Sequence, residues 1–251
     1  MIETLAERLS DSPYIDAVSY GHTISDGSVI RPAETNWHMV LMRHQGETQM
    51  LMTGPLTSSE RIGWQAGGEL LWLRFELGVY MPHLPLKYFI DREEALPNAS
   101  SQRFWLKSTA WQFPNYENVE TFVARLVKEE ILISDPVVSA VMQEQPQYIA
   151  PRTVRHHFTQ ATGLTQKQVR QIERAQAAAL MLKRGVSILD TVYELGYFDQ
   201  PHLTRSLKQW IGYTPAQLYR SSIDCHFIQD PALWPDYTPH GDTVINHAAQ
   251  A

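Results

Sequence analysis

The sequence has a single cysteine, no long apolar run and no basic leader. The lone Cys225 excludes an internal disulfide framework and a zinc site built from several cysteines. No stretch approaches eighteen uninterrupted apolar residues, so the sequence predicts no membrane span. Residues 1–18 lack a basic segment followed by an apolar one, so no secretory signal is expected. These absences favour a soluble, cytoplasmic protein.

Positive charge is scarce overall, yet it is concentrated in one part of the chain. The 251 residues carry a formal net charge of −6. The charge is −8 over residues 1–150, +6 over 151–220 and −4 over 221–251. A cationic block between two acidic segments is typical of a module that faces phosphate groups, and a chance asymmetry is the alternative.

The first hundred residues carry short, aromatic-rich segments separated by glycine and proline turns. Their spacing of about ten residues predicts antiparallel strands in a small barrel or sandwich. The predicted strands are 35–43, 47–54, 59–64 and 69–78. Aromatic side chains on or near these strands are candidates for an effector pocket, and ordinary core packing is the alternative. These candidates are Trp37, Trp64, Trp72, Phe75 and Tyr80.

The histidines of this region do not form a metal-binding pattern. His22, His38 and His44 include no H-x-H pair of the kind that a metal-binding cupin needs. We therefore expect no metal site and no cofactor in this chain.

Hydrophobic residues take a helical period from about residue 117 onward. Apolar side chains at helical spacing over 117–133 predict a helix whose stripe is either core or a dimer face. A serine or aspartate cap at 134–135, followed by Pro136, predicts the start of another helix. We place a domain boundary near residue 134.

The helical part contains an internal repeat. Residues 151–169 align without gaps onto 200–218, at an offset of 49. The matched pairs include Val154 with Leu203 and Phe158 with Leu207. Between the two copies, residues 165–185 form a long predicted helix that Gly185 stops.

The second copy has the features of a helix-turn-helix unit. Ser187 caps a predicted helix over 188–195, Gly196 makes the turn, and Asp199 caps the next helix. Pro201 is tolerated because the first helical turn has no intrahelical partner for its missing N–H. The buried stripe of this helix is predicted to be Leu203, Leu207, Trp210 and Ile211.

The opposite face of each copy is polar and basic. In a helix-turn-helix unit the first residues of the second helix reach base edges in the major groove, while other cations bind phosphates. A solvated surface is the alternative, but such a surface has no reason to repeat at a fixed offset. The predicted DNA-binding residues are Arg152, Thr153, Arg155, His156, Gln200, Pro201, His202, Arg205 and Lys208.

The segment GYFDQPHLTRSLKQWIGYTPAQLYR, residues 196–220, resembles the signature of the AraC/XylS family of bacterial transcription regulators. The resemblance covers about residues 135–220. It implies a DNA-binding domain of seven helices with two helix-turn-helix units, and a companion domain that senses an effector or mediates dimerisation. In the first unit, Pro146 interrupts the stretch before the recognition helix and Ala150 is a poor cap. The first positioning helix is therefore expected to be shortened.

Together these features predict an α+β protein. An N-terminal antiparallel β-barrel or sandwich, similar to cupin-like sensor domains, occupies residues 1–133 with its terminal helix. The all-α DNA-binding domain occupies 134–220, and an acidic tail occupies 221–251. The predicted function is regulation of transcription through double-stranded DNA, with a small-molecule effector and a homodimer as further partners. The alternatives are an N-terminal domain that only oligomerises, and an enzyme domain fused to a DNA-binding module.

Overall fold

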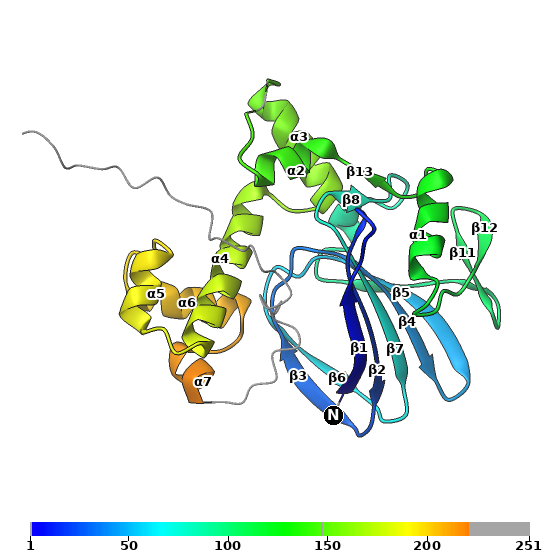
Figure 1. Cartoon of the computed structure of the whole chain (residues 1–251), viewed down its shortest axis with the longest axis horizontal. Helices are drawn as coiled ribbons and strands as arrows, with labels where there is room; N and C mark the ends of the chain where they lie inside the picture. The colour runs from blue at the N-terminus through cyan, green and yellow to red at the C-terminus, as the bar shows by residue number, and fades with distance from the viewer. Residues whose placement is uncertain (1, 147, 221–251) are drawn as a thin grey trace, which may run out of the picture.

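The structure is a computed structural model that describes residues 2–146 and 148–220. The predicted acidic tail and Cys225 lie outside the described residues. A strand-rich region precedes a helical one, so the expected α+β class is confirmed (Figure 1).

The main sheet has antiparallel strands in the order β1-β2-β7-β4-β5-β9. These strands are β1 (Ile2–Leu9), β2 (Ile15–Thr23), β4 (His38–His44), β5 (Glu47–Thr53), β7 (Glu69–Phe75) and β9 (Glu93–Leu96). β3 (Gly27–Arg31) and β6 (Glu60–Trp64) form a separate two-stranded ribbon. Within residues 2–146 the strands do not close into a barrel, and the cupin-like barrel is not confirmed.

The remaining strands are short. β10 (Asn98–Ser100), β11 (Arg103–Leu106) and β12 (Thr109–Gln112) form a small sheet, and β8 (Val79–Tyr80) pairs with β13 (Ile133–Ser134). The 3-10 helix η1 (Leu86–Tyr88) follows β8. The four predicted strands correspond to β4–β7, with bounds that differ by at most three residues. The strands before residue 32 and after residue 78 were not predicted.

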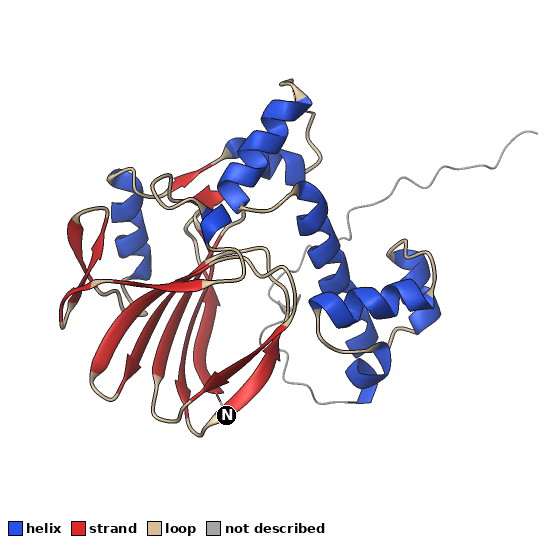
Figure 2. Cartoon of the chain, turned by 180° about the vertical axis from the view of Figure 1, so that it is seen from behind, coloured by secondary structure: helices blue, strands red, loops and turns tan. Residues whose placement is uncertain are grey.

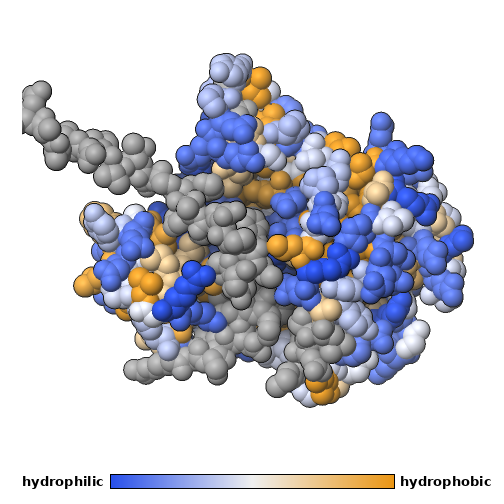
Figure 3. All heavy atoms as spheres, viewed as in Figure 1, coloured by the Kyte–Doolittle hydropathy of each residue, from blue (hydrophilic) through white to orange (hydrophobic). Residues whose placement is uncertain are grey.

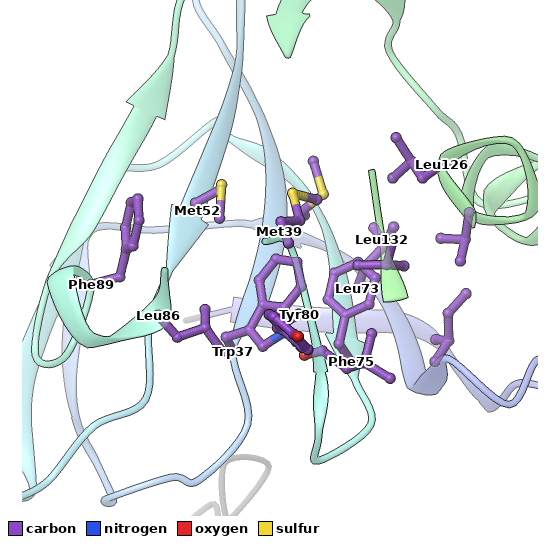
Figure 4. Packing of buried hydrophobic residues seen from close by; sticks show 14 of the residues in the cluster. Trp37, Met39, Met52, Leu73, Phe75, Tyr80, Leu86, Phe89, Leu126 and Leu132 are labelled. Carbon is purple, nitrogen blue, oxygen red and sulfur yellow. The ribbon is translucent and has the colours of Figure 1, made fainter. Parts of the chain in front are cut away.

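One face of the main sheet carries the hydrophobic core. Alternate residues of β7 are buried on this face, because successive side chains of a strand point to opposite sides, and Met39 and Leu41 of β4 belong to the same core. Figure 4 shows Met39, Leu73 and Phe75 among the residues that pack here. Helix α1 (Val119–Lys128) adds Phe122 and Leu126 to the same core. Its apolar stripe is therefore core and not a dimer face.

Six helices lie between residues 134 and 220, one fewer than the resemblance implies. They are α2 (Pro136–Met142), α3 (Pro151–Thr162), α4 (Gln166–Lys183), α5 (Ile188–Glu194), α6 (Gln200–Trp210) and α7 (Pro215–Arg220). Figure 2 shows α4 running from α2–α3 at one end to α5–α7 at the other, beside the sheet. The predicted long helix and its stop at Gly185, which has φ +84°, are confirmed.

Two separate cores divide the buried apolar residues. The first core joins the sheet and α1 to Phe158 and Leu164 of the first unit, and to Ile172 in the first half of α4. The second core begins at Ala175 and holds α5–α7 around the second half of α4. The cores therefore divide inside α4, while the domain boundary near residue 134 stays a prediction.

Candidate nucleic-acid interface

The second helix-turn-helix unit consists of α5, a tight turn and α6. The Ser187 hydroxyl accepts the Asp190 N–H at 3.1 Å and so caps α5. Gly196 makes the turn with φ +63°. The Asp199 carboxylate accepts the His202 N–H at 2.7 Å and caps α6, with Pro201 in the first turn. Both predicted caps are confirmed.

The inner face of α6 packs into the second core. Leu203, Leu207 and Ile211 are fully buried there, whereas Trp210 is partly buried. The sequence analysis missed Ser206, which is buried on the same face. Its hydroxyl is 3.0 Å from the hydroxyl of Tyr197, so the two polar groups satisfy each other inside this core.

The outer face of α6 is free to meet a ligand. Gln200, Pro201, Arg205 and Lys208 are exposed. In the described part of the chain, neither Arg205 nor Lys208 belongs to an ion pair. A free guanidinium can fork onto guanine O6 and N7, and a free ammonium can bind a phosphate as a point charge.

His202 is the one predicted contact on α6 that is half-buried. Its Nδ1 lies 3.4 Å from the N–H of Phe198 and accepts it, and its ring meets Tyr197 edge-on at 5.2 Å. An acceptor at Nδ1 places the ring hydrogen of the neutral form on Nε2. His202 therefore has a donor left for a base or a phosphate.

The surface of the second unit also carries apolar side chains that the sequence analysis did not single out. In Figure 3, apolar atoms lie among hydrophilic ones over the second unit, at the left. Leu189 and Tyr193 are 73% and 87% exposed and lie one turn apart on α5, and Phe198 in the turn is 90% exposed. The exposed face of this unit is therefore not uniformly polar.

The first unit has the same parts with a longer connection. α2 has seven residues, as α5 does, so the first positioning helix is not shorter than the second. The two helices of the unit are instead separated by residues 143–150, against 195–199 in the second unit. Ala150 makes no side-chain cap at the start of α3, as predicted.

A buried carboxylate holds the first unit together. Asp135 caps α2 by accepting the Val137 N–H at 2.9 Å, and it also lies 2.7 Å from Nδ1 of His157 on α3. This pair links the start of α2 to the middle of α3 and was not predicted. The candidate DNA contacts of α3 all lie on its exposed side: Arg152, Thr153, Arg155 and His156.

The repeat extends to the caps that follow each recognition helix. Gly163 and Gly212 end α3 and α6 with φ of +75° and +86°. Thr165 and Thr214 then accept the backbone N–H of the glutamine three residues later, at 3.2 and 3.3 Å. The offset of 49 therefore marks equivalent local structures in the two units.

The five candidate pocket aromatics do not converge on one cavity. Trp37 stacks on Phe75 with ring centroids 4.1 Å apart, and both are buried in the first core with Tyr80. Trp72 lies between core-facing Leu71 and Leu73 on β7, so it points to the opposite face of the sheet. Trp64 lies on the β3–β6 ribbon and donates to the Ser25 carbonyl. An effector pocket in this half of the chain stays a prediction.

A shallow pocket does exist elsewhere on the core face of the sheet. Tyr20, Leu41 and Leu71 line it together with Tyr116 from the loop before α1. Arg43 and Glu69, which form an ion pair at 3.6 Å, also line it. None of the five predicted aromatics lines this pocket.

Ionisable side chains are buried near the loop between β3 and β4. Glu34 lies 3.2 Å from Arg31 and 3.0 Å from His38, and Arg74 pairs with Asp16. Burial favours a neutral Glu34, but His38 and Arg31 outweigh this effect and lower the pKa of its carboxyl. Burial lowers the pKa of the His38 ring, and the neighbouring Glu34 carboxylate opposes this effect.

Residues 2–146 and 148–220 offer neither a metal-ligand cluster nor a membrane-spanning helix. No group of three metal-ligating His, Cys, Asp or Glu side chains was found there. No helix in the same residues has the length and apolar character needed to cross a membrane.

The architecture and the exposed faces define a helix-turn-helix DNA-binding protein. A family model described as a helix-turn-helix domain matches residues 148–221, a range that begins just before α3 and includes α7. This match supports a DNA-binding transcription regulator, in agreement with the resemblance of residues 196–220 to the AraC/XylS signature. No curated protein and no solved structure matched the chain significantly.

Proposed function

We propose that this protein is a sequence-specific regulator whose helices α3 and α6 enter successive major-groove segments of one DNA duplex. The carrying observation is that the first two turns of α3 and of α6, 49 residues apart, both present exposed side chains able to contact DNA. Arg152 and His156 do so on α3, and Gln200 and Arg205 on α6. The two pairs of turns are joined by the rigid helix α4.

The length of α4 is compatible with this arrangement. Its eighteen residues span about 27 Å at a rise of 1.5 Å per residue. Successive major-groove segments on one face of a duplex are roughly 34 Å apart. Helix α6 packs against the second half of α4, whereas α3 precedes the start of α4 and belongs to the first core, so α4 separates the two recognition helices.

Selection of bound sites from random DNA tests this proposal. Two conserved boxes about one helical turn apart are expected if both helices read bases. A single box would contradict a reading role for α3 and leave α6 as the one recognition helix. Complete absence of sequence preference would contradict the whole proposal.

For the N-terminal half we propose the sensing of a small molecule by a protein that acts in the cytoplasm without making or breaking bonds. An effector that binds two arrangements of this half unequally would change how the DNA-binding helices are presented. Because the sheet shares a core with α3, the screen should use the full chain. Small metabolites are expected to include one that raises the melting temperature and alters DNA affinity.

The oligomerisation alternative predicts a different result. A homodimer whose DNA affinity depends on protein concentration, together with no stabilising metabolite in the screen, would favour it over sensing. Sedimentation at several protein concentrations measures the first part.

A further inference from the structure

The C-terminal end of α6 is bonded to the N-terminal half of the chain. The last four carbonyls of a helix lack intrahelical donors and need partners from elsewhere. The Trp210 carbonyl accepts the Ala33 N–H at 2.6 Å. The Gln209 carbonyl accepts the Ser59 N–H at 2.9 Å and the Ser59 hydroxyl at 3.2 Å. The strand-rich region therefore caps the candidate recognition helix.

Ala33 makes a second hydrogen bond to the helical half, this time to α4. Gln176 of α4 is only 7% exposed, and its side-chain amide donates to the Ala33 carbonyl at 2.9 Å. The Ala33 backbone thus bonds α6 through its N–H and α4 through its C=O. Side chains of the strand-rich half also approach the Gly212 backbone closely, since a Cβ on Gly212 would lie 2.5 Å from Cγ2 of Ile30.

The loop that carries Ala33 is itself firmly anchored. We call residues 32–37 the Ala33 loop. Glu34 forms a β-bridge with Leu56 through hydrogen bonds of 3.0 and 2.8 Å, and its carboxylate is held by Arg31 and His38. A loop fixed on both sides can hold a helix in one orientation.

These contacts matter because the second unit does not share the first core. The first unit belongs to the core of the strand-rich half through Phe158 and Leu164, with α3 against η1 and β8, whereas α5–α7 have their own core. Trp210 of α6 packs against both cores, and the end of α6 is joined to the strand-rich half by the hydrogen bonds of Ala33 and Ser59. Such contacts fix direction and distance more strictly than apolar packing, since hydrogen bonds weaken steeply with angle.

We propose that the Ala33 loop and Ser59 position α6 relative to α3, and so fix the spacing of the two DNA boxes that the protein accepts. Gln176, Ala33 and Ser59 are positioning residues, since none of them lies on the DNA-binding face. The inference rests on the proposed function, because it requires that both α3 and α6 read DNA.

The test measures how DNA affinity depends on the spacing between the two boxes. A residue that only stabilises the fold would not change this dependence. Inserting one base pair between the boxes shifts the second box by about 3.4 Å and rotates it by roughly 35°. We expect the full-length protein to lose roughly tenfold or more in affinity for such a site. Gln176→Leu, which keeps the side-chain volume and removes the donor, should reduce this discrimination at least threefold.

Two controls accompany this variant. Gln171→Leu lies on the same helix, and the side chain of Gln171 makes no hydrogen bond in the described structure, so this variant should retain the discrimination of the unmodified protein. Ser59→Ala removes one bond to Gln209 and should shift the discrimination in the same direction as Gln176→Leu, by less. It also serves as the deciding variant if Gln176→Leu fails to fold by circular dichroism.

The outcomes separate the two claims. Affinity that is insensitive to the second box in the unmodified protein means that the proposed function is wrong. Spacing discrimination that is present in the unmodified protein and unchanged in folded Gln176→Leu and Ser59→Ala overturns the positioning role alone. Loosened discrimination in these variants, with the Gln171→Leu control unchanged, supports it.

Discussion

The two helix-turn-helix units share a sequence pattern but are held in different ways. The first unit packs into the core of the strand-rich half through Phe158 and links its helices through the Asp135–His157 pair. The second unit has a core of its own and a side-chain cap, Asp199, on its recognition helix. The first unit lacks that cap, because Ala150 stands at the start of α3.

The difference shows that one local pattern can be stabilised by two kinds of surroundings. Where the helices of a unit pack into the core of a neighbouring region, the cap and the turn of that unit contribute less to its stability. Where a unit has a core of its own, the cap, the turn and its apolar stripe contribute more to its stability. The structure of the first unit thus depends more on tertiary contacts than that of the second unit, and less on its local sequence.

The largest expected effect comes from breaking the two cores separately. Phe158→Ala should cost about 3–5 kcal/mol and Leu207→Ala about 2–5 kcal/mol, because each leaves a cavity in a buried site. Hydrogen exchange resolved by residue should show that Phe158→Ala loosens the main sheet as well as α3. Leu207→Ala should loosen α5–α7 and leave the sheet protected. Equal loosening of the sheet by both variants would contradict the division into two cores.

The next largest effect is a loss of DNA affinity when predicted DNA contacts of the two units are removed. Arg205→Ala should cost about 1–3 kcal/mol on specific DNA and relax the base preference in one box. Arg152→Ala should do the same in the other box if α3 docks as α6 does. Lys208→Ala should instead weaken binding to all sequences and flatten the salt dependence. Titrations against single-base variants of the selected site at two salt concentrations measure all three.

A pH effect is expected at the junction between the two cores. Burial raises the pKa of Glu173 on α4 to about 7, opposed by Arg170. Between pH 4.5 and 7 the folded chain retains a proton that the unfolded chain has released, so the free energy of unfolding falls as pH rises. Glu173→Gln should therefore gain about 1–2 kcal/mol over the unmodified protein at pH 8, because the side chain is only partly buried.

At pH 4 the same variant should show no gain, because both states of the unmodified protein are then protonated at this position. Urea unfolding at the two pH values measures the difference. Equal gains at pH 4 and pH 8 would contradict a titrating Glu173. Glu76, whose pKa burial and Asp16 also raise to about 7, is unchanged in both proteins and cancels in the comparison.

The smallest effect is expected from variants that remove the N-cap of one recognition helix and add an N-cap to the other. Asp199→Ala should cost about 1 kcal/mol, because the N–H of His202 loses its acceptor. Ala150→Asp should stabilise α3 by a few tenths of a kcal/mol to about 1 kcal/mol, because it supplies the missing acceptor. Thermal unfolding measures both, and a gain from Ala150→Asp that matches the loss from Asp199→Ala would show that the caps of the two units are equivalent.

Much of the helical half could be predicted from the sequence. The caps at Ser187 and Asp199, the position of Pro201 and the stop at Gly185 follow from local hydrogen bonding and backbone freedom, which act within one helical turn. The strands β4–β7 follow from aromatic segments between turn signals. The length of α2 was not predicted correctly, because its end depends on how residues 143–150 cross to α3.

The positions of the five aromatic pocket candidates could not be predicted from the sequence. Periodicity indicates that Trp37 and Trp72 lie on strands, but it does not say which face meets the core. The register of β7 placed Phe75 inward and Trp72 outward, so the five side chains were separated. Strands before residue 32 were missed because their apolar residues are mixed with polar ones and are not separated by clear turn signals.

The sequence by itself determined the local parts of this protein: two capped helix pairs at a fixed offset, with their basic faces, and a set of strands. It could do so because caps, turns and amphipathic stripes depend on neighbours within a few residues. Only the tertiary structure decided that the first unit shares the core of the sheet while Ala33 and Ser59 bond the end of α6. Those contacts join residues more than a hundred positions apart, and their geometry depends on the whole fold.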